Sequence, residues 1–289
     1  MKTALHKSLI PDSRLFVAKH LEEKHFDPSW HAHPEYQLFV VLQGTGTRFI
    51  GDSIKSFKAG ELILTGPHLP HLWRSDEVYF HNKSKRYTEG IVIYFPEIFF
   101  SDAWSGKEEV ASIKKLLQKS TRGLEFYGAT KTEVIPLMSG LPSATGFESL
   151  LQLFKILLLL STCKEYHFIS HAVYVDPFKE VETDRMNKVY AYVLKNYKGN
   201  VLLHDAANIV CMTPTSFSRY FTRKNNKTFS RFVSEIRIKH ACKLLTETDK
   251  TVAQVSLQCG FNTLSNFNKQ FKEIMLKKPY EYKKEFMNL

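Results

Sequence analysis

The strongest constraint in this sequence is a pattern that occurs twice in its last third. Phe217 and Phe221 are followed, 50 residues later, by Phe267 and Phe271, and the two aromatic residues of each pair are four positions apart. This spacing places both rings of a pair on one face of a helix, where they can be buried together. A basic residue lies two positions after the first aromatic residue and belongs to a different face. The pattern predicts two similar helices, each with an apolar and a polar face.

Each of these helices follows a shorter apolar segment and a tight turn. The first turn contains Thr213-Pro214, where threonine suits the cap of a helix and proline its first turn. The second contains Gly260, which suits the left-handed residue after a helix, and then Asn262 or Thr263 as the next cap. A short helix, a turn and a second helix make a helix–turn–helix unit. The sequence predicts two of these units.

The segment between the two units also has helical spacing. Apolar residues recur through residues 229–245, and a helix of about 17 residues is ~26 Å long. With the turns at its ends, such a helix would hold two recognition helices near the ~34 Å repeat of successive major grooves on one face of DNA. We therefore expect a rigid spacer between two DNA-reading units.

Positive charge is concentrated in the same part of the chain. Residues 184–289 contain 19 of the 40 lysines and arginines but only 8 of the 29 acidic residues, so the whole net charge of +11 lies there. Such an asymmetry indicates a polyanionic partner, either nucleic acid or an anionic membrane. A basic surface that serves only solubility is the alternative.

The composition disfavours several other classes of protein. The longest apolar block, residues 156–160, is far shorter than the ~20 residues of a membrane-spanning helix. The four cysteines are widely spaced without a CxxC pair, so neither a zinc site nor a disulfide framework is expected. Residues 1–10 contain no apolar run followed by a cleavage site, which favours a cytoplasmic protein.

The first part of the chain has the pattern of a β-structure followed by helices. Short apolar runs end at glycine or proline turn signals, which predicts a β-barrel or sandwich; the runs are residues 36–42, 47–50, 61–64 and 91–95. From about Lys107 the apolar spacing becomes helical, and a strongly apolar stripe is formed by Leu150, Leu151, Phe154, Leu157 and Leu158. The barrel, a neighbouring helix or a second subunit could cover this stripe. Residues 166–183 are interpreted as a linker or as an extended segment on the first domain.

The basic third resembles the DNA-binding domain of AraC/XylS-type transcriptional regulators. The resemblance covers residues 201–286 and preserves order and spacing; it is carried by residues 213–221, 237–245, 259–261, 267–272 and 279–282. Two positions depart from the family pattern: Ser256 replaces the usual alanine, and Lys278 precedes Pro279 where serine or threonine is commoner.

The resemblance implies which side chains enter the DNA grooves. The expected groove-facing residues are Thr215, Ser216, Ser218 and Arg219 in the first unit, and Thr263, Leu264, Ser265, Asn266, Asn268 and Lys269 in the second. Arginine can bond guanine, asparagine can bond adenine, and leucine can contact a thymine methyl group. Arg223, Lys224, Lys227 and Lys272 suit phosphates. A solvated helix face is the alternative for each of these residues.

Residues 26–73 resemble the cupin barrel, which precedes the DNA-binding domain in many AraC-type regulators. The resemblance is carried by His31-Ala32-His33, by a glycine turn, and by a later segment that ends at His71. It implies a ligand site built from His31, His33, Gln37, His71 and Trp73. Gln37 occupies the place of the carboxylate in metal-binding cupins, and an amide is a poor substitute for it. We therefore expect no metal and no cofactor. The alternative interpretation is a vestigial barrel that binds no ligand and serves only dimer contacts.

Together these patterns predict an α+β protein. A cupin-like β-barrel with helices is expected over residues 1–165, a linker over 166–183, and an all-α domain with two helix–turn–helix units over 184–289. The expected function is sequence-specific transcription regulation, without enzymatic activity. The expected partners are double-stranded promoter DNA, an unknown small-molecule effector and a second subunit that contacts residues 150–158, with RNA polymerase as a further candidate and no membrane. Activation is our working expectation, and the residues are equally compatible with repression.

Two alternatives belong to other functional classes. A cupin enzyme, such as a metal-dependent dioxygenase or isomerase with a DNA-binding appendage, would need a bound metal and turnover. A basic protein that binds a membrane surface is disfavoured because the outward residues between Phe267 and Phe271 are asparagine and glutamine.

Overall fold

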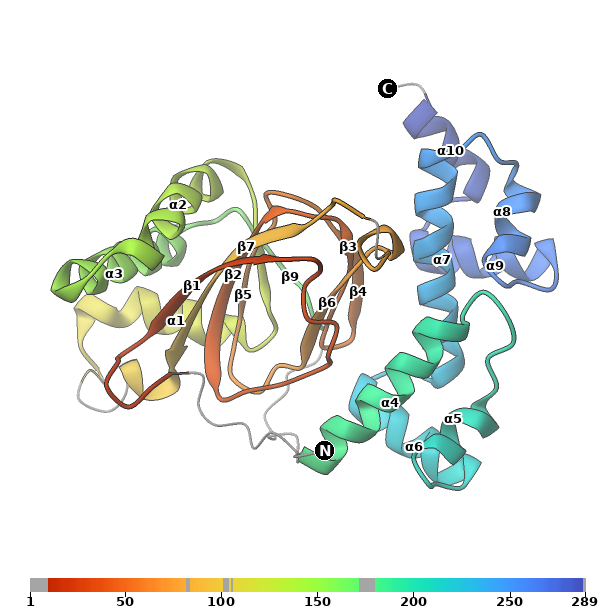
Figure 1. Cartoon of the computed structure of the whole chain (residues 1–289), viewed down its shortest axis with the longest axis horizontal. Helices are drawn as coiled ribbons and strands as arrows, with labels where there is room; N and C mark the ends of the chain where they lie inside the picture. The colour runs from red at the N-terminus through yellow and green to blue at the C-terminus, as the bar shows by residue number, and fades with distance from the viewer. Residues whose placement is uncertain (1–9, 82–83, 101–103, 105, 172–179, 288–289) are drawn as a thin grey trace. The chain divides into compact units, whose positions relative to one another are not determined.

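The computed structural model describes residues 10–81, 84–100, 104, 106–171 and 180–287. The chain forms two compact units, Met1–Thr183 and Asp184–Leu289 (Figure 1). The first combines β-sheets with helices and the second is helical, which confirms the predicted α+β class. None of the helices within the described residues has the length and apolar character needed to cross a membrane.

Two antiparallel sheets form the first unit. The larger sheet has the order β1 (Val17–Glu23), β7 (Thr88–Pro96), β2 (Glu35–Gln43), β5 (Leu62–Thr65), β8 (Leu124–Phe126), β9 (Tyr166–Phe168). The smaller sheet has the order β4 (Ser53–Phe57), β3 (Gly46–Ile50), β6 (His71–Ser75). All four apolar runs of the sequence are therefore strands, as predicted.

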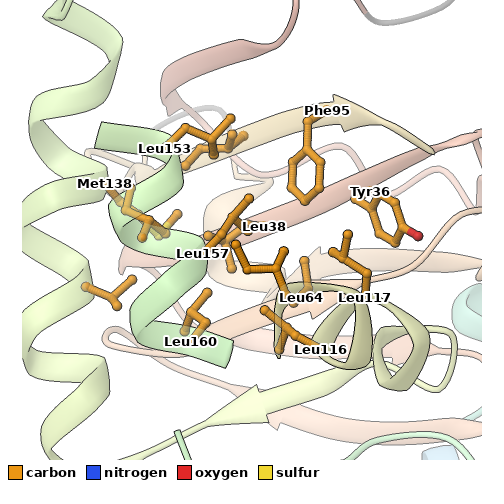
Figure 2. Packing of buried hydrophobic residues seen from close by; sticks show 14 of the residues in the cluster. Tyr36, Leu38, Leu64, Phe95, Leu116, Leu117, Met138, Leu153, Leu157 and Leu160 are labelled. Carbon is orange, nitrogen blue, oxygen red and sulfur yellow. The ribbon is translucent and has the colours of Figure 1, made fainter. Parts of the chain in front are cut away.

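The central strands of the larger sheet, β7, β2 and β5, are buried on both faces because their residues alternate between two cores. Phe39 and Ile63 belong to a core shared with Ile50 of the smaller sheet. Leu38 and Leu64 belong to a second core, completed by three helices: α1 (Ala111–Ser120), α2 (Gly128–Gly140) and α3 (Gly146–Thr162). Figure 2 shows leucines of α1 and α3 packed beside these strand residues. Short 3₁₀ turns lie at Glu77–Tyr79, Glu97–Phe100, Glu108–Val110 and Leu141–Ser143.

The apolar stripe of α3 is only partly covered. The buried face consists of Leu153, Ile156, Leu157 and Leu160, so Leu157 is the one member of the predicted stripe that is fully buried. Leu151 and Leu158 remain 49% and 52% exposed. The predicted stripe differs from the observed buried face because a helix with so many leucines has no single apolar face in its sequence. The sheet and the neighbouring helices cover one side of α3, and its other side is open.

Residues 166–170 belong to the first unit rather than to a linker. Tyr166–Phe168 forms the edge strand β9, paired with β8. The backbone N–H groups of Ile169 and Ser170 donate to the carbonyls of Gly123 and Arg122. The expected domain end at residue 165 is therefore too early, and the alternative of an extended segment on the first domain applies here. Residues 172–179, which include Asp176-Pro177, lie outside the described residues.

The second unit consists of seven described helices. They are α4 (Glu180–Asn196), α5 (Leu203–Ile209), α6 (Pro214–Asn225), α7 (Phe229–Glu247), α8 (Val252–Gln258), α9 (Leu264–Met275) and α10 (Pro279–Met287). In Figure 1, α5 and α6 lie toward one end of α7, and α8 and α9 lie toward the other. The expected order is confirmed: two short-helix–turn–helix units with one helix between them. The connecting helix α7 has 19 residues and is ~28 Å long.

Candidate nucleic-acid interface and barrel interior

The first helix–turn–helix unit presents a polar face from α6. The side chain of Thr213 accepts a hydrogen bond from the backbone N–H of Ser216 at 3.2 Å, and Pro214 opens the helix, as predicted. Phe217 and Phe221 are fully buried, which anchors the apolar face. The predicted groove residues lie on the other side, with Thr215, Ser216 and Arg219 exposed and Ser218 half-buried.

The second unit repeats this arrangement in α9. Thr263, rather than Asn262, caps the helix by accepting from the N–H of Asn266 at 3.2 Å. Phe267 and Phe271 are fully buried. All six predicted groove residues of this unit, from Thr263 to Lys269, are exposed. Both helix–turn–helix units therefore direct the predicted groove-facing residues away from their cores.

The candidate phosphate contacts differ in availability. Arg223 and Lys272 are exposed, and Lys224 is half-buried. Lys227 forms an ion pair with Glu235 at 2.6 Å, and its side chain is only 13% exposed. Within the described part of the chain, by contrast, no hydrogen bond or ion pair involves the Arg219 side chain, so its guanidinium is available for a base. Lys227 would have to break its ion pair before it could reach a phosphate.

Three polar side chains meet inside the first unit. His33 lies just before β2, Gln37 lies near the start of β2, and His71 is the first residue of β6; all three are buried. The Oε1 position of Gln37 lies 3.1 Å from Nε2 of His33 and 3.1 Å from Nε2 of His71. The sequence therefore identified side chains that converge although they are up to 38 residues apart.

The remaining predicted ligand residues surround this contact. The ring of His31 lies 4.5 Å from that of His71, and its Nδ1 contacts the carbonyl of Ser29 at 2.8 Å. Trp73 is buried, with its ring 5.6 Å from that of His71. One ring nitrogen from each of His31, His33 and His71 lies within 4.8 Å of the others. These nitrogens could hold a transition-metal ion, but the oxygen beside them belongs to an amide instead of a carboxylate.

The ring of His71 is neutral in this environment. Burial lowers its pKa well below the usual range, and the neighbouring His31 and His33 lower it further. Its Nδ1 contacts the carbonyl of Leu69 at 2.7 Å, so this nitrogen carries the proton and donates it. The barrel interior consequently presents a neutral imidazole with its second nitrogen directed at Gln37.

Comparisons with known proteins assign both units to known domain types. Residues 206–285 match the model of a helix-turn-helix domain, and residues 19–94 match that of a cupin domain. The chain joins a cupin domain to an AraC-type helix-turn-helix domain. The predicted resemblances are thus confirmed at the level of both domains.

Two curated relatives each match part of this chain. The uncharacterized HTH-type transcriptional regulator YdeC of Bacillus subtilis (strain 168) is 32% identical over 109 residues, 38% of either chain. The transcriptional activator PerA of Escherichia coli O127:H6 is 33% identical over 132 residues, 45% of this chain and 46% of PerA. The chain therefore spans less than half of the length of these relatives. Among solved structures, ToxT from Vibrio cholerae O395 aligns over 95% of this chain and 99% of its own, with 16% identity and a TM-score of 0.37.

The first unit, Met1–Thr183, also contains a buried ion cluster that the candidate site residues did not include. Nε of Arg48 donates to Glu61 at 2.9 Å, and Nη2 donates to Glu125 at 2.7 Å. Burial raises the pKa of Glu61 despite Arg48. Burial alone would also raise the pKa of Glu125, but Arg48 and Lys55 together hold it below the usual range. The sequence signal was weak because Arg48 and Glu125 are 77 positions apart.

Two tyrosines near the predicted site differ in orientation: Tyr36 faces the helices, and Tyr94 faces the barrel interior. Tyr36 belongs to the core under the helices, with its ring 5.0 Å from that of Phe95, so it does not line the barrel interior. Burial, with help from Glu97, raises the pKa of Tyr36 to about 12. Tyr94, by contrast, lies 5.3 Å from the His33 ring and was not identified from the sequence. Its position opposite Gln37 on the adjacent strand adds a phenol to the barrel interior.

Proposed function

We propose that the chain is a sequence-specific DNA-binding regulator of transcription, controlled by a small-molecule effector in the cupin barrel. The observation that carries the proposal is the duplicated α6 and α9 surface. Each helix is capped by threonine, anchored by two buried phenylalanines, and exposes groove-compatible side chains. Residues 184–289 also hold the whole net charge of +11, which favours binding to phosphates.

The barrel interior supports the effector part of the proposal. A site for a polar small molecule needs a few buried polar groups that converge, and His33, Gln37 and His71 converge at 3.1 Å contacts. An effector acts by binding two arrangements of the protein with different affinities. We therefore propose that ligand at these residues shifts the protein between arrangements that differ in DNA binding.

Further partners follow from the same account. The exposed side of α3, with Phe147, Leu151 and Leu158, suits contact with a second copy, and a dimer would favour paired DNA sites. Promoter DNA is the proposed target, with RNA polymerase as a further partner. The name of the relative PerA, a transcriptional activator, supports activation. Because such a regulator acts on the chromosome, we propose a cytoplasmic location.

The test is selection of bound sequences from random duplexes by the full-length chain, followed by affinity measurements at several salt concentrations. We expect an enriched motif with two short conserved blocks about one helical turn apart. Affinity should fall at least about 100-fold between roughly 50 and 200 mM salt, because several phosphates are neutralised. Repeating the selection with candidate metabolites should change recovery if the barrel binds an effector.

The contrary results are specific. Recovery of random sequence only, with a folded protein, would contradict sequence-specific regulation. Metal retained at one ion per chain, together with turnover of a small molecule, would favour the cupin enzyme instead. The observation behind that second candidate is the approach of three histidine nitrogens to within 4.8 Å.

A further inference from the structure

Arg237 lies in α7 at the boundary between the two helix–turn–helix cores. On its N-terminal side, Phe232 packs against Tyr190 of α4 and Phe221 of α6. On its C-terminal side, Ile238 belongs to the core of the second unit. The two units therefore share one helix, and Arg237 occupies the point where that helix passes from one core to the other.

The Arg237 side chain connects this boundary to the loop between α4 and α5. Its Nε donates to the carbonyl of Tyr197 at 2.8 Å, and its Nη2 donates to the carbonyl of Gly199 at 2.7 Å. Residues 197–199 are the first part of the segment that connects α4 to α5. A guanidinium has a planar fork of donors, so it can hold two carbonyls of one loop in a fixed orientation.

The turn between α8 and α9 contacts the same loop. Gly260, two residues after the end of α8, has φ +80°, and a Cβ atom at this position would lie 2.6 Å from the carbonyl oxygen of Tyr197 and 2.9 Å from that of Lys198. The adjacent ring of Phe261 lies 5.7 Å from the guanidinium carbon of Arg237. The loop at residues 197–199 is consequently packed between α7 and the turn before α9.

The turn of the first helix–turn–helix unit, between α5 and α6, provides an internal comparison. Cys211 occupies the place after α5 that Gly260 occupies after α8, and it has a similar φ of +55°. Cys211 is exposed, so its turn accommodates a side chain. The left-handed conformation therefore does not by itself demand glycine in these turns. The close approach of the loop is what distinguishes the turn at Gly260.

On the basis of the proposed DNA binding, we infer that this loop is a brace that fixes the separation of α6 and α9. Arg237 holds the loop by two hydrogen bonds, and the absence of a side chain at Gly260 leaves room for it. A single connecting helix allows two attached units to bend and twist relative to each other. A second contact away from the helix axis removes that freedom. Arg237 and Gly260 are thus positioning residues, which set how strictly the protein requires one spacing between the two halves of its DNA site.

The test compares the full-length wild-type chain with Arg237→Lys and Gly260→Ala. Arg237→Lys keeps the charge but removes the fork, and Gly260→Ala places a methyl group against the loop. Cys211→Ala is the matched control in the other turn, and Lys195→Met controls for changes at an exposed helix surface. The probes are duplexes selected by the wild-type chain, without insertion or with one or five extra base pairs between the two conserved blocks. One base pair adds about 3.4 Å, and five rotate the second block by about half a turn.

We expect the wild-type chain and both controls to lose about tenfold in affinity on insertion of one base pair, a loss typical of one mismatched pair. Arg237→Lys and Gly260→Ala should lose about threefold or less, because their units can adjust to the longer site. All proteins should bind the five-pair duplex alike, through one unit. Equal one-pair losses in wild type and Arg237→Lys would overturn the brace. Failure of the wild-type chain to select any sequence would overturn the DNA binding on which the brace depends.

Discussion

The Nε2 atom of His71 lies 3.1 Å from the side-chain oxygen position of Gln37. Because Nδ1 of this neutral ring donates to the carbonyl of Leu69, Nε2 carries a lone pair and needs a donor. Gln37 supplies that donor when its amide is turned by half a rotation, since an amide nitrogen carries two hydrogens. The same nitrogen then also reaches Nε2 of His33. Gln37 can therefore donate to both imidazoles without any cation between them.

This arrangement predicts a gain of metal binding in Gln37→Glu. A carboxylate has no hydrogen to donate, so it would face two nitrogen lone pairs and favour a cation between them. After incubation with Zn²⁺ and dialysis, elemental analysis should find close to one ion per Gln37→Glu chain and far less in wild type. Gln37→Glu/His71→Ala is the control that removes a ligand. An equimolar ion retained by the wild-type chain would contradict this account of Gln37.

A second prediction concerns pH and His71. The folded protein keeps this ring neutral because burial lowers its pKa well below the usual range, whereas the unfolded chain protonates it below about pH 6.5. The unfolded state then binds more protons, so the free energy of unfolding decreases as pH falls below about 6.5. We expect His71→Gln to reduce this slope by up to about 1.4 kcal/mol per pH unit.

Urea unfolding in metal-free buffer at a series of pH values measures this slope. His81→Gln is the matched control, because His81 is exposed and lies in the same unit. Parallel curves for wild type and His71→Gln below pH 6.5 would refute a neutral, buried His71.

The third prediction concerns Arg219. Its exposed side chain on α6 is expected to bond guanine through two donors. Arg219→Ala should weaken binding to the selected site by ~1–3 kcal/mol and relax the preference at one or two base pairs. Arg219→Lys should keep the affinity for random DNA but lose the same preference. Equal losses on selected and random duplexes would make Arg219 a phosphate contact.

The fourth prediction concerns the open side of α3. Leu151 and Leu158 are two turns apart on this helix and about half exposed. If they meet a second copy, Leu151→Glu/Leu158→Glu should convert dimers to monomers in sedimentation experiments, because two charges would be buried without partners. Gln118→Glu adds a charge at an exposed position of α1 as a control. Unchanged sedimentation of the double variant would exclude this side of α3 as the dimer contact.

Local patterns in the sequence predicted the helical unit, residues 184–289, well. Thr213 and Thr263 cap their helices, and the paired phenylalanines are buried, because capping and helical periodicity are decided within a few residues. The convergence of His33, Gln37 and His71 was also anticipated, through the resemblance to cupins. Lys227 shows where such patterns stop, since its ion pair with Glu235 is not visible in a run of basic residues.

Contacts between distant residues could not be read in this way. Arg237 holds a loop 40 positions earlier, and Arg48 reaches Glu125 across 77 positions. Neither pairing follows from any periodicity, because each depends on how separate elements pack. The predicted buried face of α3 was wrong for a related reason. The many leucines of this helix offer several apolar faces, and only packing against the sheet decides which of them is buried.

The most direct measurement is methylation interference on a selected duplex, with the full-length chain at a single site. Binding by both α6 and α9 predicts two groups of sensitive guanine N7 atoms in the major groove, on one face of the duplex and about 10 base pairs apart. Arg219→Ala should remove sensitivity from one group only. A single group, or sensitivity spread evenly along the duplex, would contradict recognition by two braced helices.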